Sequence, residues 1–185
     1  MTTLTPAQAQ DTAVYALDRA HTTIEFVARH LMIAKVRGRF TNFDGRIEMA
    51  AGTDLPQAAS VTIDATSIDT REEQRDAHLR SADFFDVEKY PELRFESTRF
   101  EGTPERFTMH GNLTVHGVTR EVSLACSFEG RANDPWGGTR IGYAAHGTIN
   151  RKDFGLTWNA ALETGGVLVG DDVRIELNVE AILQS

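Results

Sequence analysis

The feature that most constrains the fold of this chain is a strict alternation of apolar and polar residues in its second half. From Asp172 to Ala181, every second residue is apolar and each residue between is polar or charged. Similar runs occupy residues 107–115, 122–128 and 141–149. A period of two gives a strand one buried face and one wet face, which is typical of antiparallel sheets. About eight such strands are present along the chain, the number that closes into a barrel around one small ligand. The predicted fold class is therefore all-β, with an eight-stranded antiparallel barrel.

One long segment, Ile68–Pro91, interrupts this alternation and is predicted to be a lid. Thr70 and Glu73 form a capping-box pattern, which predicts a short helix over about residues 71–80. The charged residues of this helix are expected to face water for the most part: Glu72, Arg75, Asp76 and Arg80. An aromatic pair follows, and such a pair left in solvent would form a patch that soluble monomers avoid. We expect Phe84 and Phe85 to fold over one end of the barrel, with the helix outside as a polar cover.

The composition argues against several classes of protein. The 185-residue chain has a net charge of −8, whereas nucleic acid binding requires clustered cations. No apolar run reaches membrane-spanning length, and the N-terminal sequence lacks the basic and apolar regions of a signal peptide. The single cysteine, Cys126, excludes an internal disulfide. These features predict a cytoplasmic protein without nucleic acid partners, with a tail at residues 1–12 and one domain at residues 13–185.

The sequence contains no recognisable catalytic motif. His78, Ser81 and Asp83 lie close together, but there is no Gly-x-Ser-x-Gly nucleophile elbow, so we interpret them as a chance grouping in a charged loop. The six histidines include no pair at the His-x-x-x-His spacing of a helical metal site. His110 and His116 fall on the predicted outer face of one strand and are interpreted as surface residues. We therefore expect neither catalysis nor a metal or other required cofactor.

Four segments carry a further signal: residues 17–47, 69–98, 111–122 and 148–182, with the distinctive motifs RDAHL, HGVTR and NRKDFG. In order and together they resemble the YceI-like family, whose members are lipocalin-like barrels that bind polyisoprenoids. The resemblance implies a lidded, lipocalin-like barrel of eight strands with a long apolar tunnel. The implied ligand is a polyprenyl, a quinone or a similar long-chain amphiphile. A homodimer is also implied, because family members are often dimeric. Members with a secretion signal work in the periplasm, and this chain shows no such signal.

The resemblance and the inward strand faces together give a candidate binding site in two parts. The tunnel wall would be apolar, made by Ile24, Phe26, Phe40, Phe43, Ile63, Phe84, Phe95, Leu113, Val115, Phe154 and Trp158. The mouth would hold a polar head group, with Arg29, His30, Arg37, Arg75, Asp76, His78 and Arg80. Plain core packing is the rival interpretation for each tunnel residue, and solvated surface charge is the rival for the mouth. Because several inward positions are small, among them Ala28, Gly111 and Ala145, the interior is either partly empty or filled by neighbouring aromatic rings.

The polar residues of the NRKDFG motif are assigned to structure rather than to binding. Asn150, Arg151 and Asp153 are expected to form a local turn that positions Phe154. Three functions remain open. The chain binds, carries or sequesters an isoprenoid-like lipid without catalysis, or it is an enzyme acting on such a lipid, or it is an interaction module with a packed interior.

Overall fold

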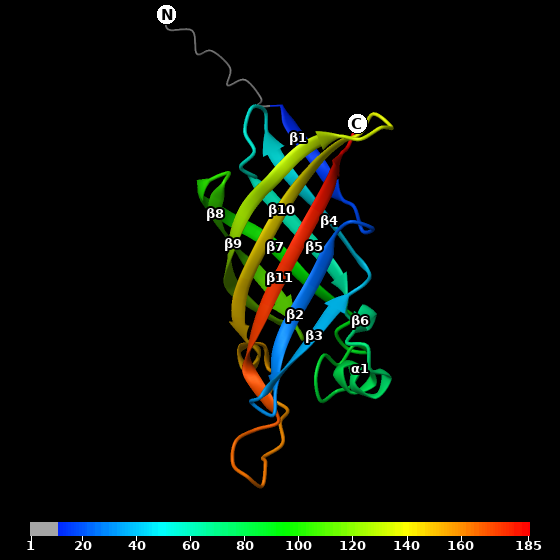
Figure 1. Cartoon of the computed structure of the whole chain (residues 1–185), viewed down its shortest axis with the longest axis vertical. Helices are drawn as coiled ribbons and strands as arrows, with labels where there is room; N and C mark the ends of the chain where they lie inside the picture. Colours follow the sequence, from blue (N-terminus) through cyan, green and yellow to red (C-terminus); the bar gives the residue numbers. More distant parts are fainter. Residues whose placement is uncertain (1–10) are drawn as a thin grey trace, which may run out of the picture.

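The computed structural model describes residues 11–185, and its main feature is a closed barrel of eight antiparallel strands (Figure 1). Neighbours follow the order β1-β4-β5-β7-β8-β9-β10-β11, and β11 pairs again with β1 to close the barrel. The barrel strands are β1 (Thr12–Leu17), β4 (Phe43–Ala50), β5 (Ala58–Asp64), β7 (Glu92–Thr103), β8 (Arg106–Val115), β9 (Val118–Asn133), β10 (Thr139–Asn150) and β11 (Val169–Leu183). Three more strands extend the sheet: β2 (Thr23–His30), β3 (Ala34–Phe40) and β6 (Ile68–Asp69). The predicted barrel is confirmed.

The predicted tail at residues 1–12 falls almost wholly outside the described part of the chain. Residues 1–10 lie beyond it, and Thr12 already belongs to β1. Within residues 11–185, no helix combines the length and the apolar composition needed to span a membrane.

β11 is long enough to pair with two strands in succession. Its last residues pair with β1, whereas the part between Val169 and Asn178 pairs with β2. Glu180 lies where the partner changes. The buried Thr22 hydroxyl donates to the Glu180 carbonyl at 3.0 Å and accepts from the Glu180 N–H at 3.1 Å. Because buried backbone groups must find partners, Thr22 completes the ladder at this junction.

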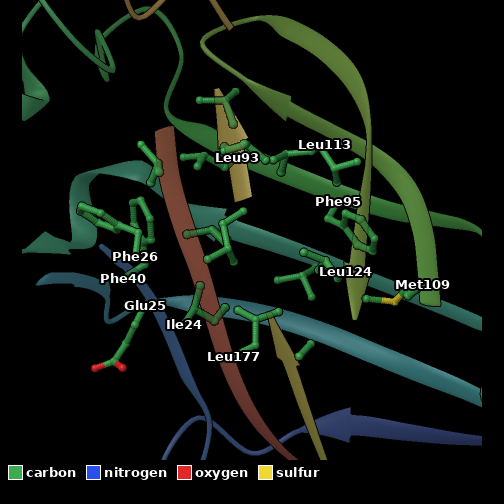
Figure 2. A pocket seen from close by; sticks show the side chains of 18 of the residues that line it. Ile24, Glu25, Phe26, Phe40, Leu93, Phe95, Met109, Leu113, Leu124 and Leu177 are labelled. Atoms are coloured by element: carbon green, nitrogen blue, oxygen red, sulfur yellow. The ribbon is translucent and has the colours of Figure 1, made fainter. Parts of the chain in front are cut away.

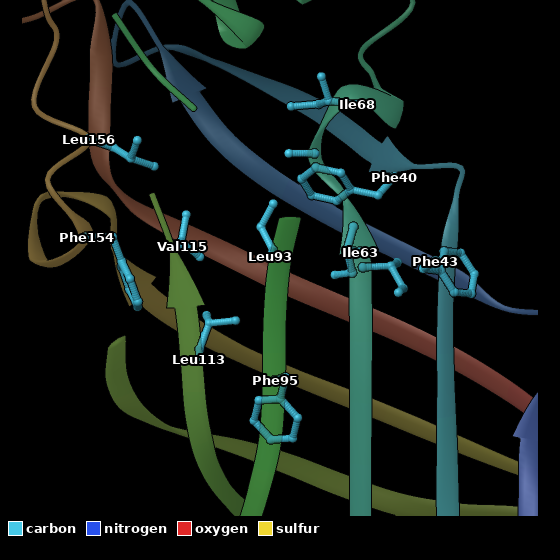
Figure 3. Close-up of a cluster of buried hydrophobic side chains, with 12 residues drawn as sticks. Phe40, Phe43, Ile63, Ile68, Leu93, Phe95, Leu113, Val115, Phe154 and Leu156 are labelled. Atoms are coloured by element: carbon cyan, nitrogen blue, oxygen red, sulfur yellow. The ribbon is translucent and has the colours of Figure 1, made fainter. Parts of the chain in front are cut away.

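The inner faces of the strands form two apolar clusters inside the barrel. Along β10, the alternating residues Ile141, Tyr143 and Ala145 are buried while His146 is exposed, as a period of two requires. One cluster lies toward the lid (Figure 3), and the other contains Tyr143 and Phe107. The core is therefore the interior of the barrel itself.

Aromatic rings occupy some of the space above the inward glycines. A Cβ atom added to Gly111 would lie 2.4 Å from the Phe95 ring, and one added to Gly38 would lie 2.2 Å from the Phe26 ring. Both glycines are therefore required by close packing of a ring against the strand. These small inward residues therefore make room for aromatic rings. This agrees with the interpretation that neighbouring rings fill part of the interior.

The lid follows the 3₁₀ turn Ala65–Ser67 and β6, and its helix α1 spans Glu73–Arg80. The predicted cap was wrong by two residues. Glu72 is the N-cap, and its carboxylate accepts from the backbone N–H groups of Gln74 and Arg75. Thr70 is instead buried beneath the helix. A carboxylate oxygen accepts from the first free N–H groups of a helix as a Thr hydroxyl does, so Glu72 takes the role predicted for Thr70.

The prediction that Asp76 faces water was also wrong. Asp76 is only 7% exposed, and its carboxylate accepts from the hydroxyl and the backbone N–H of Thr70. Arg75 donates to the same Thr70 hydroxyl at 2.7 Å and to its carbonyl at 2.8 Å. Arg80 donates to the carbonyls of Thr66 and Ile68 at 2.8 and 2.7 Å. The polar side of the helix therefore bonds to the chain that leads into it, from Thr66 to Thr70.

Candidate functional site

Inside the barrel, the side chains leave a cavity of about 250 Å³ (Figure 2). The surface that surrounds it is apolar. Glu25 is the labelled exception in Figure 2, and its carboxylate points away from the cavity and pairs with Arg37 at 3.0 Å. A molecule in the cavity would therefore be held by apolar burial, at about 0.8 kcal/mol for each buried CH₂.

Nine of the eleven residues proposed for the tunnel line this cavity: Ile24, Phe26, Phe40, Ile63, Phe84, Phe95, Leu113, Val115 and Phe154. Phe43 and Trp158 do not. Phe43 is buried in the apolar cluster near the lid, and Trp158 packs against the outer part of the lid, 4.6 Å from the His78 ring. Contact of the nine residues with a ligand stays a prediction.

The cavity extends beyond the predicted residues into the second apolar cluster. Lining residues that sequence reasoning missed include Ile47, Phe107, Leu124, Cys126 and Tyr143. Their signal was the same alternation that placed Leu113 inside, since Leu124 and Cys126 alternate along β9. Burial raises the pKa of the Cys126 thiol to about 11. The thiol is therefore protonated at neutral pH and acts as a small apolar wall residue.

Among the described residues, one buried cation lies beside the cavity, and its hydrogen bonds go to backbone carbonyls. The Arg151 guanidinium, at the start of the 3₁₀ turn Arg151–Phe154, donates to the carbonyls of Gly170 (2.9 Å), Leu156 (2.7 Å) and Trp158 (2.9 Å). Burial lowers its pKa. These bonds fold the segment after β10 so that Phe154 points into the cavity wall, which confirms the structural role predicted for Arg151.

The lid closes one end of the cavity with three apolar side chains. Phe84 and Phe85 both line the cavity, as expected for a lid, and Phe85 meets Phe40 edge-on with ring centroids 6.0 Å apart. Leu79 of α1 also lines it, so the helix is not wholly outside as predicted. Phe84 packs against Trp158 at 5.3 Å, which joins the lid to the segment after β10.

The seven residues proposed for the mouth do not come together, and none of them lines the cavity. Arg75, Asp76 and Arg80 bond to the chain that leads into the lid helix, as described above. His78 lies against the Trp158 and Phe84 rings and contacts Asp83 at 2.9 Å. Arg37 pairs on the outer face with Glu25 and, at 2.6 Å, with Glu176. Arg29 and His30 are the last two residues of β2. The residues proposed for one mouth therefore lie in three separate places: the lid helix, the outer face at Arg37, and the end of β2.

One group in the described residues has the spacing of a metal site: Asp18, His21 and Glu180. Arg140 already occupies its centre, with Nη1 at 2.6 Å from carboxylate oxygens of both Asp18 and Glu180. Its Nε also binds Asp134 at 2.9 Å. The arrangement is an ion-pair cluster in which one guanidinium bridges three carboxylates.

A second group has the connectivity of a hydrolytic triad on the outer face of the barrel. Ser123 lies 2.7 Å from His110 Nδ1, and His110 Nε2 lies 3.3 Å from Glu101. All three side chains come from neighbouring strands of one sheet. A triad also needs free backbone N–H groups to stabilise an oxyanion, and N–H groups inside such a sheet are engaged in the strand ladder. The group is therefore a cross-strand hydrogen-bonded ladder.

Comparison with known proteins identifies the same architecture. A sequence model of the YceI-like domain matches residues 15–181. A UPF0312 protein of Staphylococcus aureus is 38% identical over 167 residues, which cover 90% of this chain and 95% of that protein. A UPF0312 protein of Serratia proteamaculans is 38% identical over 172 residues, covering 92% of this chain and 86% of that protein.

Solved structures agree with the fold. The YCEI protein of Campylobacter jejuni is 30% identical, with a TM-score of 0.75 over 85% of this chain and 90% of its own. The BcnA structure of Burkholderia cenocepacia has a TM-score of 0.76 at 19% identity, covering 89% of this chain and 98% of its own. A polyisoprenoid binding domain from Saccharophagus degradans has a TM-score of 0.66 at 17% identity, covering 92% of this chain and 98% of its own. With the matching domain and the barrel geometry on the same residues, the chain belongs to the YceI-like family.

Proposed function

We propose that this protein binds a long-chain isoprenoid-like lipid, such as a polyprenyl or a quinone with an isoprenoid tail, and carries or sequesters it unchanged. The observation that supports this most is the apolar cavity inside the barrel, because its surface presents no polar group to a ligand. Such a cavity suits a hydrocarbon tail rather than a polar metabolite.

The family relationship supports the same class of ligand. A structural neighbour is described as a polyisoprenoid binding domain, and its barrel superimposes on this one. The absence of polar groups at the cavity surface also argues for binding without catalysis, since a general acid, base or nucleophile must reach the reacting atoms.

Trp158 offers a direct test of binding, because it contacts Phe84 of the lid. The chain has two tryptophans, and a Trp136→Phe variant leaves Trp158 as the single reporter. Titration of delipidated protein with a polyprenol, or with a quinone that quenches fluorescence, should give a saturable change in Trp158 emission. A quinone head group without its tail is the control and should give no saturable change. Equal response to head group and full molecule would overturn the proposal.

Two further parts of the proposal concern the cellular setting. We place the protein in the cytoplasm as a homodimer, from the low cysteine content and from the resemblance to dimeric family members. Cell fractionation and light scattering test these two parts. Recovery from a periplasmic or secreted fraction, or a monomer mass at working concentration, would contradict them.

A further inference from the structure

The turn between β2 and β3 exposes consecutive apolar side chains at the lid end of the barrel. Ile33 is 83% exposed and Met32 is 51% exposed, and Leu31 is also exposed. The segment between β10 and β11 lies beside this turn, because the Leu31 N–H donates to the Leu168 carbonyl at 2.8 Å, and its exposed Val167 precedes that residue (Figure 1). We call Leu31, Met32, Ile33 and Val167 the apolar tip.

The backbone of the turn is unfavourable for the residues that occupy it. Leu31 and Met32 have φ angles of 53° and 62°, and the Ile33 N–H donates to the His30 carbonyl at 3.2 Å. Positive φ at both central residues is the geometry of a type I′ turn, which strongly favours Asn-Gly. Two large apolar residues there cost conformational energy and leave apolar surface in water.

Unpaired cations lie directly behind the apolar tip. Arg29 and Lys35 face each other across the hairpin, both are exposed, and neither takes part in an ion pair among residues 11–185. By contrast, Arg37 and Arg39 further along are paired with carboxylates. In the neighbouring segment 159–168, Glu163 is the only charged residue. Apolar side chains ahead of Arg and Lys are the arrangement by which proteins insert into the surface of an anionic bilayer.

The cavity wall ends close to this tip. Ala28 and Val169 both line the cavity, and Val169 pairs with His30, the residue before the turn. We propose that the apolar tip docks the barrel on an anionic lipid bilayer, with the lid end toward the membrane. The docking is inferred independently of what the cavity binds. The use of docking for uptake or release of lipid rests on the function proposed above.

Vesicle co-sedimentation tests the docking. The protein should bind vesicles of phosphatidylcholine with phosphatidylglycerol more strongly than vesicles of phosphatidylcholine alone. A Leu31→Asn/Met32→Gly variant supplies the residues that a type I′ turn prefers, so the hairpin should keep its fold and its melting temperature. Its vesicle affinity should fall about tenfold or more, the effect of about 1.4 kcal/mol of lost apolar burial. Trp136→Ser, which removes an 85% exposed side chain at the other end of the barrel, is the matched control and should bind as the wild type does.

A second variant tests the contribution of the two cations behind the apolar tip. Arg29→Gln/Lys35→Gln should remove most of the preference for phosphatidylglycerol and most of the salt dependence of binding. Equal vesicle binding by the wild type and the Leu31→Asn/Met32→Gly variant would overturn the inference, as would no binding by the wild type. A dimer that this variant abolishes would also overturn it, because a second copy would then be the occupant of the tip. Native mass spectrometry distinguishes this failure from that of the proposed function, since it reports cavity contents whether or not vesicles bind.

Discussion

At the scale of single residues, the cavity divides the buried phenylalanines into two kinds. Phe43 and Phe84 are buried to similar extents, at 4% and 6% exposed, but only Phe84 lines the cavity and belongs to the lid. Phe43→Ala should cost about 3–5 kcal/mol of unfolding free energy, as for a core ring. Phe84→Ala should cost less and should speed the release of bound lipid. Dissociation rate and melting temperature, measured together, check this. An equally large stability loss in both variants, with lipid released only on unfolding, would contradict the role of Phe84 as a gate.

Leu113 tests the wall of the cavity in the same way. A Leu113→Trp substitution would fill space that Leu113 now borders, so the longest lipid chain bound should shorten. Overpacking is expected to cost about 1–3 kcal/mol. Asn112→Trp, on the adjacent exposed position of β8, is the control and should leave the bound chain lengths unchanged. Identical lipid profiles for the two folded variants would place Leu113 outside the binding surface.

Residue positions inside the barrel could be predicted because alternation along a strand determines which side chains point inward. Leu113 and Val115 follow this rule. Trp158 does not follow the rule, because it lies outside the regular strands, where side chains do not alternate. Its position depends instead on the Arg151 guanidinium, which donates to the Trp158 carbonyl. The mouth residues also escaped prediction. A sequence shows which side chains carry charge, but it does not show which ones donate to backbone carbonyls, as Arg80 does.

At the scale of elements, the lid is held by polar bonds as much as by its apolar face. Arg80→Met would keep the aliphatic stem and remove two hydrogen bonds to backbone carbonyls, at a cost of about 1–3 kcal/mol for partners left unsatisfied. Hydrogen exchange in residues 71–90 should become faster, while exchange in β8 to β11 should not change. Lys89→Met is the control, because the Lys89 ammonium lies 5.2 Å from the centre of the Tyr90 ring and no hydrogen bond joins it to a carbonyl among residues 11–185. Faster exchange throughout the barrel would mean that the lid and barrel unfold as one unit.

The helix of the lid could be predicted, but its orientation could not. Capping residues mark where a helix begins, and Thr70 fits that preference whereas the observed cap is Glu72. Only packing decides between them, because Thr70 is buried and bonded to Asp76. The helix carries few apolar residues, so the sequence lacked the stripe that would have shown which side faces the barrel.

At the scale of the whole molecule, one ion cluster joins the β1–β2 turn, the β9–β10 turn, β10 and β11. Arg140 lowers the pKa of Asp18 to about 2, with a smaller contribution from His21. The usual value for Asp in an unfolded chain is about 3.9, so the ionised carboxylate stabilises the folded state. This stabilisation is complete above about pH 4 and is lost as the pH falls toward about 2. Asp18→Asn should lower the melting temperature at neutral pH and reduce its decline between those values. Thermal unfolding across acid pH measures both, and parallel acid slopes for variant and wild type would contradict the assignment.

The central claim is that the barrel encloses an isoprenoid-like lipid. Native mass spectrometry of the purified full-length protein, followed by lipid extraction and mass analysis, tests it most directly. We predict a bound species that survives gentle ionisation, that is lost on denaturation, and whose extracted mass contains repeating isoprene units. A Leu113→Trp sample, measured in parallel, should retain shorter species. A protein of bare polypeptide mass that also takes up no polyprenol or quinone in the Trp158 titration would contradict the account.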